Sequence, residues 1–369
     1  MKFRIKRLKL LNALAKATKA VSLKTPLAVL IGVKFELLSD RLILTGSDSD
    51  LTIRTVIKDD EDLEVIEEGS VVLNSRYVLD TVRKFDAEYL DIEIIDGFLT
   101  RITGDKSKID LNGIDPIEYP RIDLSKTGSN FVMSSFLLKD IINETKFAAS
   151  DKENKPVLTG INFKANNGQL ECVATDSYRL AKKIVSLDND ISFNITIPKL
   201  SLDEISKIIE KDENMEIFVS DRKILFSLNN SLIQTRLIDG SFPDTARLIP
   251  SEYGHELTID NLYLQSAIDR VSLLSTDQNN IIKLDMSEDR VILSSYSQEV
   301  GSAEENLSSA FFKGEPLTIS FSSKYANDAI KSFNAGKIKI CFTENNKPFV
   351  VTDYEKDDLL QLLLPVRTM

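Results

Sequence analysis

Side chains that could carry out covalent or acid–base chemistry are few in this chain. His255 is its only histidine, so a Ser-His-Asp or Cys-His mechanism has a single candidate base. Cys172 and Cys341 lie in strand-like runs, where a buried reduced thiol is more typical than a disulfide. The sequence has no glycine-rich phosphate loop and too few cysteines and histidines for a zinc site. We therefore expect no catalytic residue, no metal site and no cofactor.

Asp48 and Asp50 are the strongest candidates for cation binding, because carboxylate oxygens suit a divalent ion. Their segment lacks the glycine and the distal glutamate of an EF-hand loop, which favours a solvated turn. An enzyme that works through carboxylates at Asp48 or Asp176 is an open alternative. However, both aspartates end similar alternating runs, at 42–48 and 170–176, which indicates a structural role in a repeated unit.

Basic side chains are distributed unevenly, although the net charge of the chain is −11. The first 24 residues contain eight lysines and arginines and no acidic residue. Among them, one stripe at helical spacing consists of Lys9, Asn12, Lys16 and Lys19. Taken alone, such a stripe is more typical of a solvated helix face. A basic face can nevertheless contact a polyanion, since binding depends on where charges sit and not on their sum.

An internal repeat organises the whole chain. Phe3, Ile5, Leu10 and Leu14 recur 128 residues later as Phe131, Met133, Leu138 and Ile142, and after a further 126 residues as Leu257, Ile259, Leu264 and Ile268. A second match joins 73–82 to 321–330, where a stripe of Arg76, Asp80 and Arg83 recurs as Lys324, Asp328 and Lys331. A fixed period means one supersecondary unit used three times. Chance similarity among amphipathic segments is the alternative.

Each unit is predicted to contain a strand, a helix, a β-meander, a second strand and helix, and closing strands. This order is typical of an α+β fold with two helices packed on antiparallel sheet. We expect domains at 1–124, 129–250 and 255–369, with His255 exposed at the second linker. No apolar run approaches the ~18 residues that cross a bilayer, and a secretory signal is lacking. We expect a soluble, cytoplasmic protein that does not bind membranes.

Three motifs carry a resemblance to a known family. They are 174–181 (ATDSYRLA), 239–244 (DGSFPD) and 362–367 (LLLPVR), in this order along the chain. Together with the opening Met1-Lys2-Phe3, they closely resemble the bacterial DNA polymerase sliding clamp, the beta subunit of DNA polymerase III. The resemblance implies a head-to-tail, ring-shaped homodimer of six domains, with helices around a central hole through which duplex DNA passes. Such a clamp is not an enzyme but a processivity factor.

The resemblance also implies residues for three contacts. Those that match the family's DNA contacts are Lys24, Arg76, Lys152, Lys155 and Lys199. Those that match its peptide-binding pocket, which would bind the replicative polymerase, the clamp loader and other clamp-binding-motif proteins, are Leu158, Thr175, Ser177, Tyr178, Arg179, Leu180, Pro243, Leu248, Leu362, Leu364 and Val366. Leu273 and Leu274 match the dimer interface, with the strand around Ile109 as the partner's edge.

A different class of function also fits part of the sequence. A three-repeat scaffold that binds peptides without encircling DNA would keep the pocket motifs. It would have no reason to place basic stripes on equivalent helices.

Overall fold

The computed structural model describes residues 1–25, 27–275 and 280–367. The chain divides into two compact units, Met1–Leu138 with Leu200–Leu237 and Lys139–Lys199 with Ile238–Met369. The predicted order of elements is confirmed in all three repeats. The division into units runs through the middle repeat, because the sheets of that repeat continue into its neighbours on both sides.

The elements of repeat one are β1 (Lys2–Lys6), α1 (Arg7–Ala17), β2 (Gly32–Leu38), β3 (Arg41–Ser47), β4 (Leu51–Lys58), β5 (Leu63–Glu67), β6 (Gly69–Asn74), α2 (Ser75–Lys84), β7 (Tyr89–Asp96), β8 (Leu99–Gly104), β9 (Ser107–Leu111) and β10 (Gly113–Ile114). Those of repeat two are β11 (Ser129–Ser134), α3 (Ser135–Thr145), β12 (Gly160–Asn166), β13 (Gln169–Thr175), β14 (Arg179–Ser186), β15 (Phe193–Pro198), α4 (Lys199–Ile208), β16 (Asn214–Val219), β17 (Lys223–Leu228) and β18 (Ser231–Arg236). Those of repeat three are β19 (His255–Asp260), α5 (Asn261–Ser272), β20 (Ile281–Met286), β21 (Val291–Ser297), β22 (Gly301–Asn306), β23 (Phe311–Lys313), β24 (Leu317–Ser322), α6 (Ser323–Lys331), β25 (Lys337–Phe342), β26 (Phe349–Asp353) and β27 (Leu359–Leu363).

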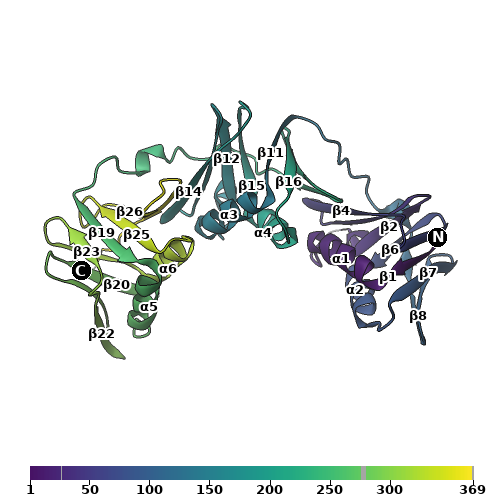
Figure 1. Ribbon diagram of the computed structural model, residues 1–369, viewed down its shortest axis with the longest axis horizontal. Coiled ribbons are helices and arrows are strands. Elements are labelled where there is room, and N and C mark those ends of the chain that lie inside the picture. Colours follow the sequence, from purple (N-terminus) through teal and green to yellow (C-terminus); the bar gives the residue numbers. More distant parts are fainter. Residues whose placement is uncertain (26, 276–279, 368–369) are drawn as a thin grey trace. The chain divides into compact units, whose positions relative to one another are not determined.

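In the first unit, α1 and α2 lie side by side and bury one face each against the strands of repeat one (Figure 1). The buried positions of α1 are Leu10, Ala13, Leu14 and Ala17, which follow the helical period seen in the sequence. The end of α1 packs closely on β3 at Gly46. A Cβ atom there would lie 2.1 Å from the carbonyl oxygen of Ala17, so only glycine fits.

Two antiparallel sheets build the first unit. One has the order β5-β1-β7-β8-β9, so β9 is an edge strand. The other has the order β10-β6-β2-β3-β4-β18-β17-β16-β11. Its β4–β18 pairing joins repeat one to repeat two, and there the hydroxyls of Thr55 and Ser231 lie 3.2 Å apart.

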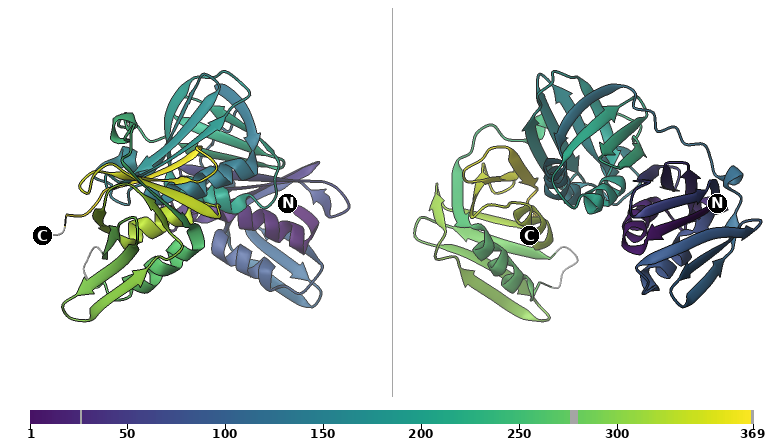
Figure 2. Two further views of the ribbon diagram at one scale, coloured as in Figure 1. Left: turned by 60° about the vertical axis from the view of Figure 1, so that its left-hand side comes forward. Right: turned by 45° about the vertical axis from the view of Figure 1, so that its right-hand side comes forward.

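The second unit repeats this plan. Its larger sheet has the order β15-β12-β13-β14-β27-β26-β25-β19-β23, and its smaller sheet the order β22-β21-β20-β24. Both α5 and α6 contribute to the core of repeat three, and the two helices lie next to each other (Figure 2). The pairing of β14 with β27 joins repeat two to repeat three, with Leu180 directly opposite Leu362. This seam is where two of the three sequence motifs meet.

The expectation for His255 was wrong. His255 is the first residue of β19, is half-buried, and stacks on Phe312 with the ring centroids 6.1 Å apart. The sequence pattern missed this strand start because the residues before it are typical of a linker. Among the residues that the structure describes, no helix is long and apolar enough to cross a membrane.

Candidate peptide pocket and DNA-binding surface

A tight turn between β13 and β14 contains the first of the three motifs. Oδ1 of Asp176 accepts hydrogen bonds from the backbone N–H groups of Tyr178 (2.9 Å) and Arg179 (3.0 Å). The hydroxyl of Thr175 donates to the carbonyl of Arg179 at 2.6 Å. Ser177 adopts a φ of 80°, a conformation uncommon outside glycine. The turn therefore holds Tyr178 and Arg179 in defined positions.

Repeat one contains an equivalent turn after β3. There, Oδ1 of Asp48 accepts hydrogen bonds from the N–H groups of Asp50 (3.0 Å) and Leu51 (2.8 Å). Asp48 and Asp176 thus play the structural role expected from their spacing, since each stabilises its own turn. What distinguishes the turn of repeat two is the pair of side chains that follows its aspartate.

Arg179 connects β14 to α6. Its side chain is 10% exposed, and its Nε and Nη1 atoms lie 3.0 Å from Oδ2 of Asp176 and 2.7 Å from Oδ2 of Asp328. The guanidinium also lies 4.4 Å from the ring centroid of Tyr325. Planar guanidinium groups suit such a combination of two carboxylates and an aromatic face. Arg179 therefore fixes the positions of side chains from two repeats.

An aromatic pair stands above this network. Tyr178 and Tyr325 stack with their ring centroids 6.5 Å apart, and Tyr178 is 57% exposed. The N–H of Leu364 donates to the carbonyl of Tyr178 at 3.0 Å. The two tyrosines border a cleft of about 620 Å³. Its other lining residues are Lys152, Asn280, Ser322, Lys324, Leu364, Pro365, Val366 and Arg367. This volume and mixed lining suit a short peptide segment.

Other residues of the expected peptide pocket lie elsewhere around the seam. Leu180 and Leu362 are buried and pack with Val173 and Val350 beneath the segment that carries Phe242. Leu158 and Thr175 are also buried. Pro243 and Leu248 are exposed, and neither lines the cleft beside Tyr325. The structure thus separates the expected set into residues buried at the seam, the exposed residues Ser177, Pro243 and Leu248, and a cleft bordered by Tyr178, Leu364 and Val366.

The expected DNA contacts also separate into groups. Lys24, Arg76 and Lys155 are exposed, and each is free of ion pairs with any described residue. Lys152 is exposed as well, but it lines the cleft beside Tyr325. Lys199 is half-buried at the start of α4, where its ammonium group pairs with Asp151 and donates to the carbonyl of Ala149 at 3.3 Å.

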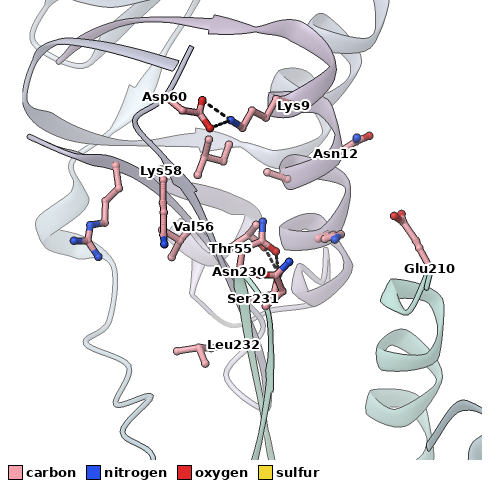
Figure 3. Close-up of a pocket in the computed structure, with 15 residues that line it drawn as sticks. Lys9, Asn12, Thr55, Val56, Lys58, Asp60, Glu210, Asn230, Ser231 and Leu232 are labelled. Atoms are coloured by element: carbon pink, nitrogen blue, oxygen red, sulfur yellow. Dashed lines mark hydrogen bonds and ion pairs between the residues drawn. The ribbon is translucent and has the colours of Figure 1, made fainter. Parts of the chain in front are cut away.

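The basic stripe of α1 borders a second cleft, of about 630 Å³ (Figure 3). Lys9, Asn12 and Lys16 line it from the helix, and strands β4 and β18 line it from the other side. Figure 3 shows Lys9 directed at Asp60, and its ammonium nitrogen lies 2.6 Å from the carboxylate. Lys16, by contrast, has no ion pair within the described part of the chain. The charge of the stripe is therefore only partly neutralised.

The residues expected at the dimer interface are exposed apolar side chains. Leu273 caps the C-terminal end of α5 and is 78% exposed, and Leu274 beside it is half-buried. Ile109 lies on the edge strand β9 and is 37% exposed. An exposed leucine at a helix end and an unpaired strand edge are both features of surfaces that bind another chain.

Comparisons with known proteins cover the full length of the chain. The family models for the N-terminal, central and C-terminal domains of the DNA polymerase III beta subunit match residues 1–123, 133–244 and 246–367. The beta sliding clamp of Bacillus subtilis strain 168 is 37% identical over 377 residues, which covers all of both chains. The chain belongs to the DNA polymerase III beta subunit family.

Solved clamp structures agree with the fold. The DNA polymerase sliding clamp from Bacillus subtilis superimposes with a TM-score of 0.96 at 36% identity, and the beta chain from Streptococcus pneumoniae with 0.96 at 34%. Both comparisons cover all of each chain. The resemblance seen in the sequence is confirmed, including the three-domain α+β architecture. The chain is a DNA sliding clamp of DNA polymerase III, a non-catalytic processivity subunit.

The thiols of this clamp fit a role without covalent chemistry. Cys172 and Cys341 are both free and buried, as the sequence indicated. Burial raises the pKa of Cys341 to about 11 and that of Cys172 well above its usual value, so both thiols stay neutral at pH 7. Within the described ranges, no group of histidine, cysteine and acidic residues is arranged to hold a metal ion.

Some residues of the clamp's cleft could not be assigned to it from the sequence. Tyr325 lies in a helix whose pattern repeats that of α2, so its sequence gives no sign of a special role. Lys152 follows α3 in an exposed loop, where a basic residue is also typical of DNA contacts. The only available signal was the Leu364-Pro365-Val366 motif, which the structure places beside both residues.

Proposed function

We propose that two copies of this clamp close head to tail into a ring around duplex DNA. The ring would hold partner proteins through the cleft beside the β14–β27 seam. The observation that carries the peptide-binding part is the Tyr178–Tyr325 pair, which borders the cleft and in which the ring of Tyr325 lies against the ion-paired guanidinium of Arg179. Exposed, rigidly held aromatic side chains next to a pocket are typical of residues that dominate the affinity of an interface.

The proposed DNA contacts are Lys24, Arg76, Lys152, Lys155 and Lys199. Lys24, Arg76 and Lys155 are the strongest of these because their exposed charges are free of ion pairs within the described residues. Contacts of this kind attract phosphates without reading bases. They suit weak, salt-dependent binding that lets a ring slide along DNA. The pairing of Lys199 with Asp151 would have to break before that residue could contact DNA.

The proposed dimer interface joins repeat one of one subunit to repeat three of the other. Strand β9 ends the five-stranded sheet and β22 ends the four-stranded sheet, so each has one edge that no described strand pairs with. Lys108 lies on β9, and Glu304 lies on β22, which makes the two edges complementary in charge. Leu273, Leu274 and Ile109 would supply the apolar contact. One such interface on each side closes a ring of two chains.

The proposed ligands of the cleft are short segments with Gln and Leu or Phe anchors. They would belong to the replicative polymerase, the clamp loader and other proteins that carry a clamp-binding motif. A replication clamp of this kind would act on bacterial DNA in the cytoplasm. The proposed domain boundaries remain 1–124, 129–250 and 255–369. A scaffold that never encircles DNA is not favoured, because the family that the chain belongs to consists of sliding clamps.

A peptide-binding measurement tests the cleft. A fluorescent peptide with Gln and Leu-Phe anchors is titrated with the clamp and followed by fluorescence polarisation. Tyr325→Ala is expected to weaken binding by about tenfold or more, as removal of a central aromatic contact does. The matched control is Tyr296→Ala, which removes a 70% exposed tyrosine from β21 of the same repeat. Equal affinities for Tyr325→Ala and wild type would contradict the proposed pocket.

A further inference from the structure

A second charged cleft lies in the first unit, away from every residue assigned above. It has a volume of about 300 Å³ and lies between the large sheet and the segment that follows β10. Lys34 on β2, Thr45 on β3 and Arg54 on β4 form its floor. Lys34 is paired with Thr45, and Thr45 with Arg54, in the register of the sheet. Directly paired residues share a face, so these three side chains stand side by side.

The other wall comes from residues 119–122. Tyr119 is 4% exposed, and its hydroxyl donates to the carbonyl of Thr45 at 3.3 Å, which holds the segment over the sheet. The side chain of Arg121 is exposed at the mouth of the cleft and has no ion pair with the residues described. The cleft is thus a built feature with a fixed wall, and not a gap between mobile side chains.

Two polar atoms in this cleft are buried without a hydrogen-bond partner among the described residues. One is the hydroxyl oxygen of Thr45, whose residue is only 2% exposed, and the other is Nε of Arg54. Buried polar groups in folded proteins are almost always paired, so two orphaned ones in the same cleft are unusual. Both can donate a hydrogen bond. A ligand with acceptor oxygens would satisfy both at once.

The charges of the cleft indicate the class of ligand. Lys34, Arg54 and Arg121 supply three positive charges, and Glu36 supplies one negative charge, which is held by Lys34 at 2.9 Å. Two positive charges remain, both on arginines. A phosphate group carries about two negative charges at neutral pH and accepts hydrogen bonds at three oxygens. Arginine binds phosphate and carboxylate alike through two parallel N–H groups, so the larger charge and the third acceptor oxygen are what favour phosphate here.

We propose that this cleft binds the phosphate group of a small soluble molecule, held by Arg54, Arg121 and the hydroxyl of Thr45. Lys34 is held by its ion pair with Glu36, which leaves the net positive charge of the cleft on the two arginines. In a chain with a net charge of −11, this local excess of positive charge suits an anionic ligand. The site is independent of the peptide cleft and of the proposed DNA contacts.

Calorimetric titration of the full chain at constant ionic strength tests the site. The probes are inorganic phosphate, diphosphate and, as the carboxylate alternative, succinate. Phosphate or diphosphate is expected to bind saturably at one site per chain and more tightly than succinate. Arg121→Gln is expected to weaken that binding by about tenfold, the usual effect of losing one charge-assisted hydrogen bond. The matched control is Arg41→Gln on the same strand as Thr45, because Arg41 already pairs with Asp40.

Thr45→Val supplies a second readout that does not depend on Arg121. Valine keeps the shape of threonine and removes the orphaned hydroxyl. The variant is expected to unfold at a higher temperature than wild type without phosphate, and to gain less from added phosphate. The proposal is overturned if wild type shows no saturable phosphate binding, if Arg41→Gln weakens it as much as Arg121→Gln, or if succinate binds more tightly.

Discussion

At the scale of single residues, Arg179 is the side chain on which the proposed peptide cleft most depends. Its guanidinium bridges Asp176 and Asp328 and supports the ring of Tyr325. Lysine at this position keeps the charge but cannot make both contacts, because an ammonium group lacks the planar fork. Arg179→Lys is expected to lower the free energy of unfolding by about 2 kcal/mol, measured with urea.

The matched control for this change is Arg270→Lys. Arg270 also makes a two-point contact, to Glu305, but its side chain is 54% exposed. Exposed pairs contribute little, so this variant should unfold like wild type. Arg179→Lys should also weaken binding of the labelled peptide, whereas Arg270→Lys should not. If the two variants have the same stability and the same peptide affinity, Arg179 does not position the cleft.

Residue roles could be predicted from the sequence only where a motif differs from its repeat counterparts. Tyr178 and Arg179 follow an aspartate whose turn also occurs in repeat one, so their side chains are what is new. The role of Tyr325 could not be predicted because the residue that it stacks on, Tyr178, lies about 150 positions away in the sequence. A local sequence pattern does not indicate contacts between residues so far apart. That the hydroxyl of Thr45 is buried without a hydrogen-bond partner likewise cannot be predicted from the alternating pattern of its strand.

At the scale of elements, the β14–β27 seam is reinforced by a buried ion network. Lys183 on β14 is 9% exposed and lies 2.9 Å from carboxylate oxygens of both Glu144 and Asp358. Gln361 on β27 donates to the carbonyl of Glu144 at 2.9 Å. Lys183→Met removes the shared cation and leaves Glu144 buried without its partner. The free energy of unfolding is expected to fall by about 3 kcal/mol at pH 7.

The same network gives a pH dependence. Burial lowers the pKa of Lys183, but the hydrogen bonds to Glu144 and Asp358 and the negative charges of both carboxylates together raise it by more, so the net direction is upward. A raised lysine pKa contributes stability that is present below the unfolded value of about 10.4 and is lost above it. The difference in urea stability between wild type and Lys183→Met should therefore stay constant from neutral pH to about pH 10. Above about pH 10 this difference in stability should become smaller. A difference that grows with pH would contradict the stabilising role assigned to the charge of Lys183.

The edges of the two smaller sheets make a separate prediction about assembly. Leu273→Asp with Leu274→Asp places charge where the proposed interface is apolar. Burying those charges is costly, so the double variant is expected to sediment as a monomer while wild type sediments as a dimer. The matched control is Leu262→Asp, because Leu262 is 72% exposed at the other end of α5. If the double variant still sediments as a dimer, the proposed interface is wrong.

Most elements could be predicted from the sequence because their apolar periods are regular and occur three times. The alternating run at 170–176 corresponds to β13, and the helical spacing of Leu10 and Leu14 to α1. The start of β19 at His255 was missed, because a single residue at the end of a strand is too short to show an alternating pattern. The pairings of β4 with β18 and β14 with β27 also could not be predicted. They join different repeats, and the alternating pattern of a strand does not indicate which other strand it pairs with.

At the scale of the whole molecule, a sliding clamp combines a negative net charge with basic residues at chosen positions. The negative average limits non-specific binding, while in the proposed ring exposed cations such as Lys24 and Arg76 would attract the DNA backbone. Contacts as weak as these cannot account for stable attachment at high salt. In the proposed ring, attachment comes from topology, because a closed ring cannot leave a closed circle of DNA.

The most direct test of the account is retention on circular DNA. The clamp is loaded onto nicked circular DNA by a clamp loader, the salt concentration is raised, and the circle is then linearised. We predict that the clamp stays on the circle at high salt and is lost once the DNA is cut. Loss from circle and linear DNA at the same salt concentration would contradict a clamp that encircles DNA.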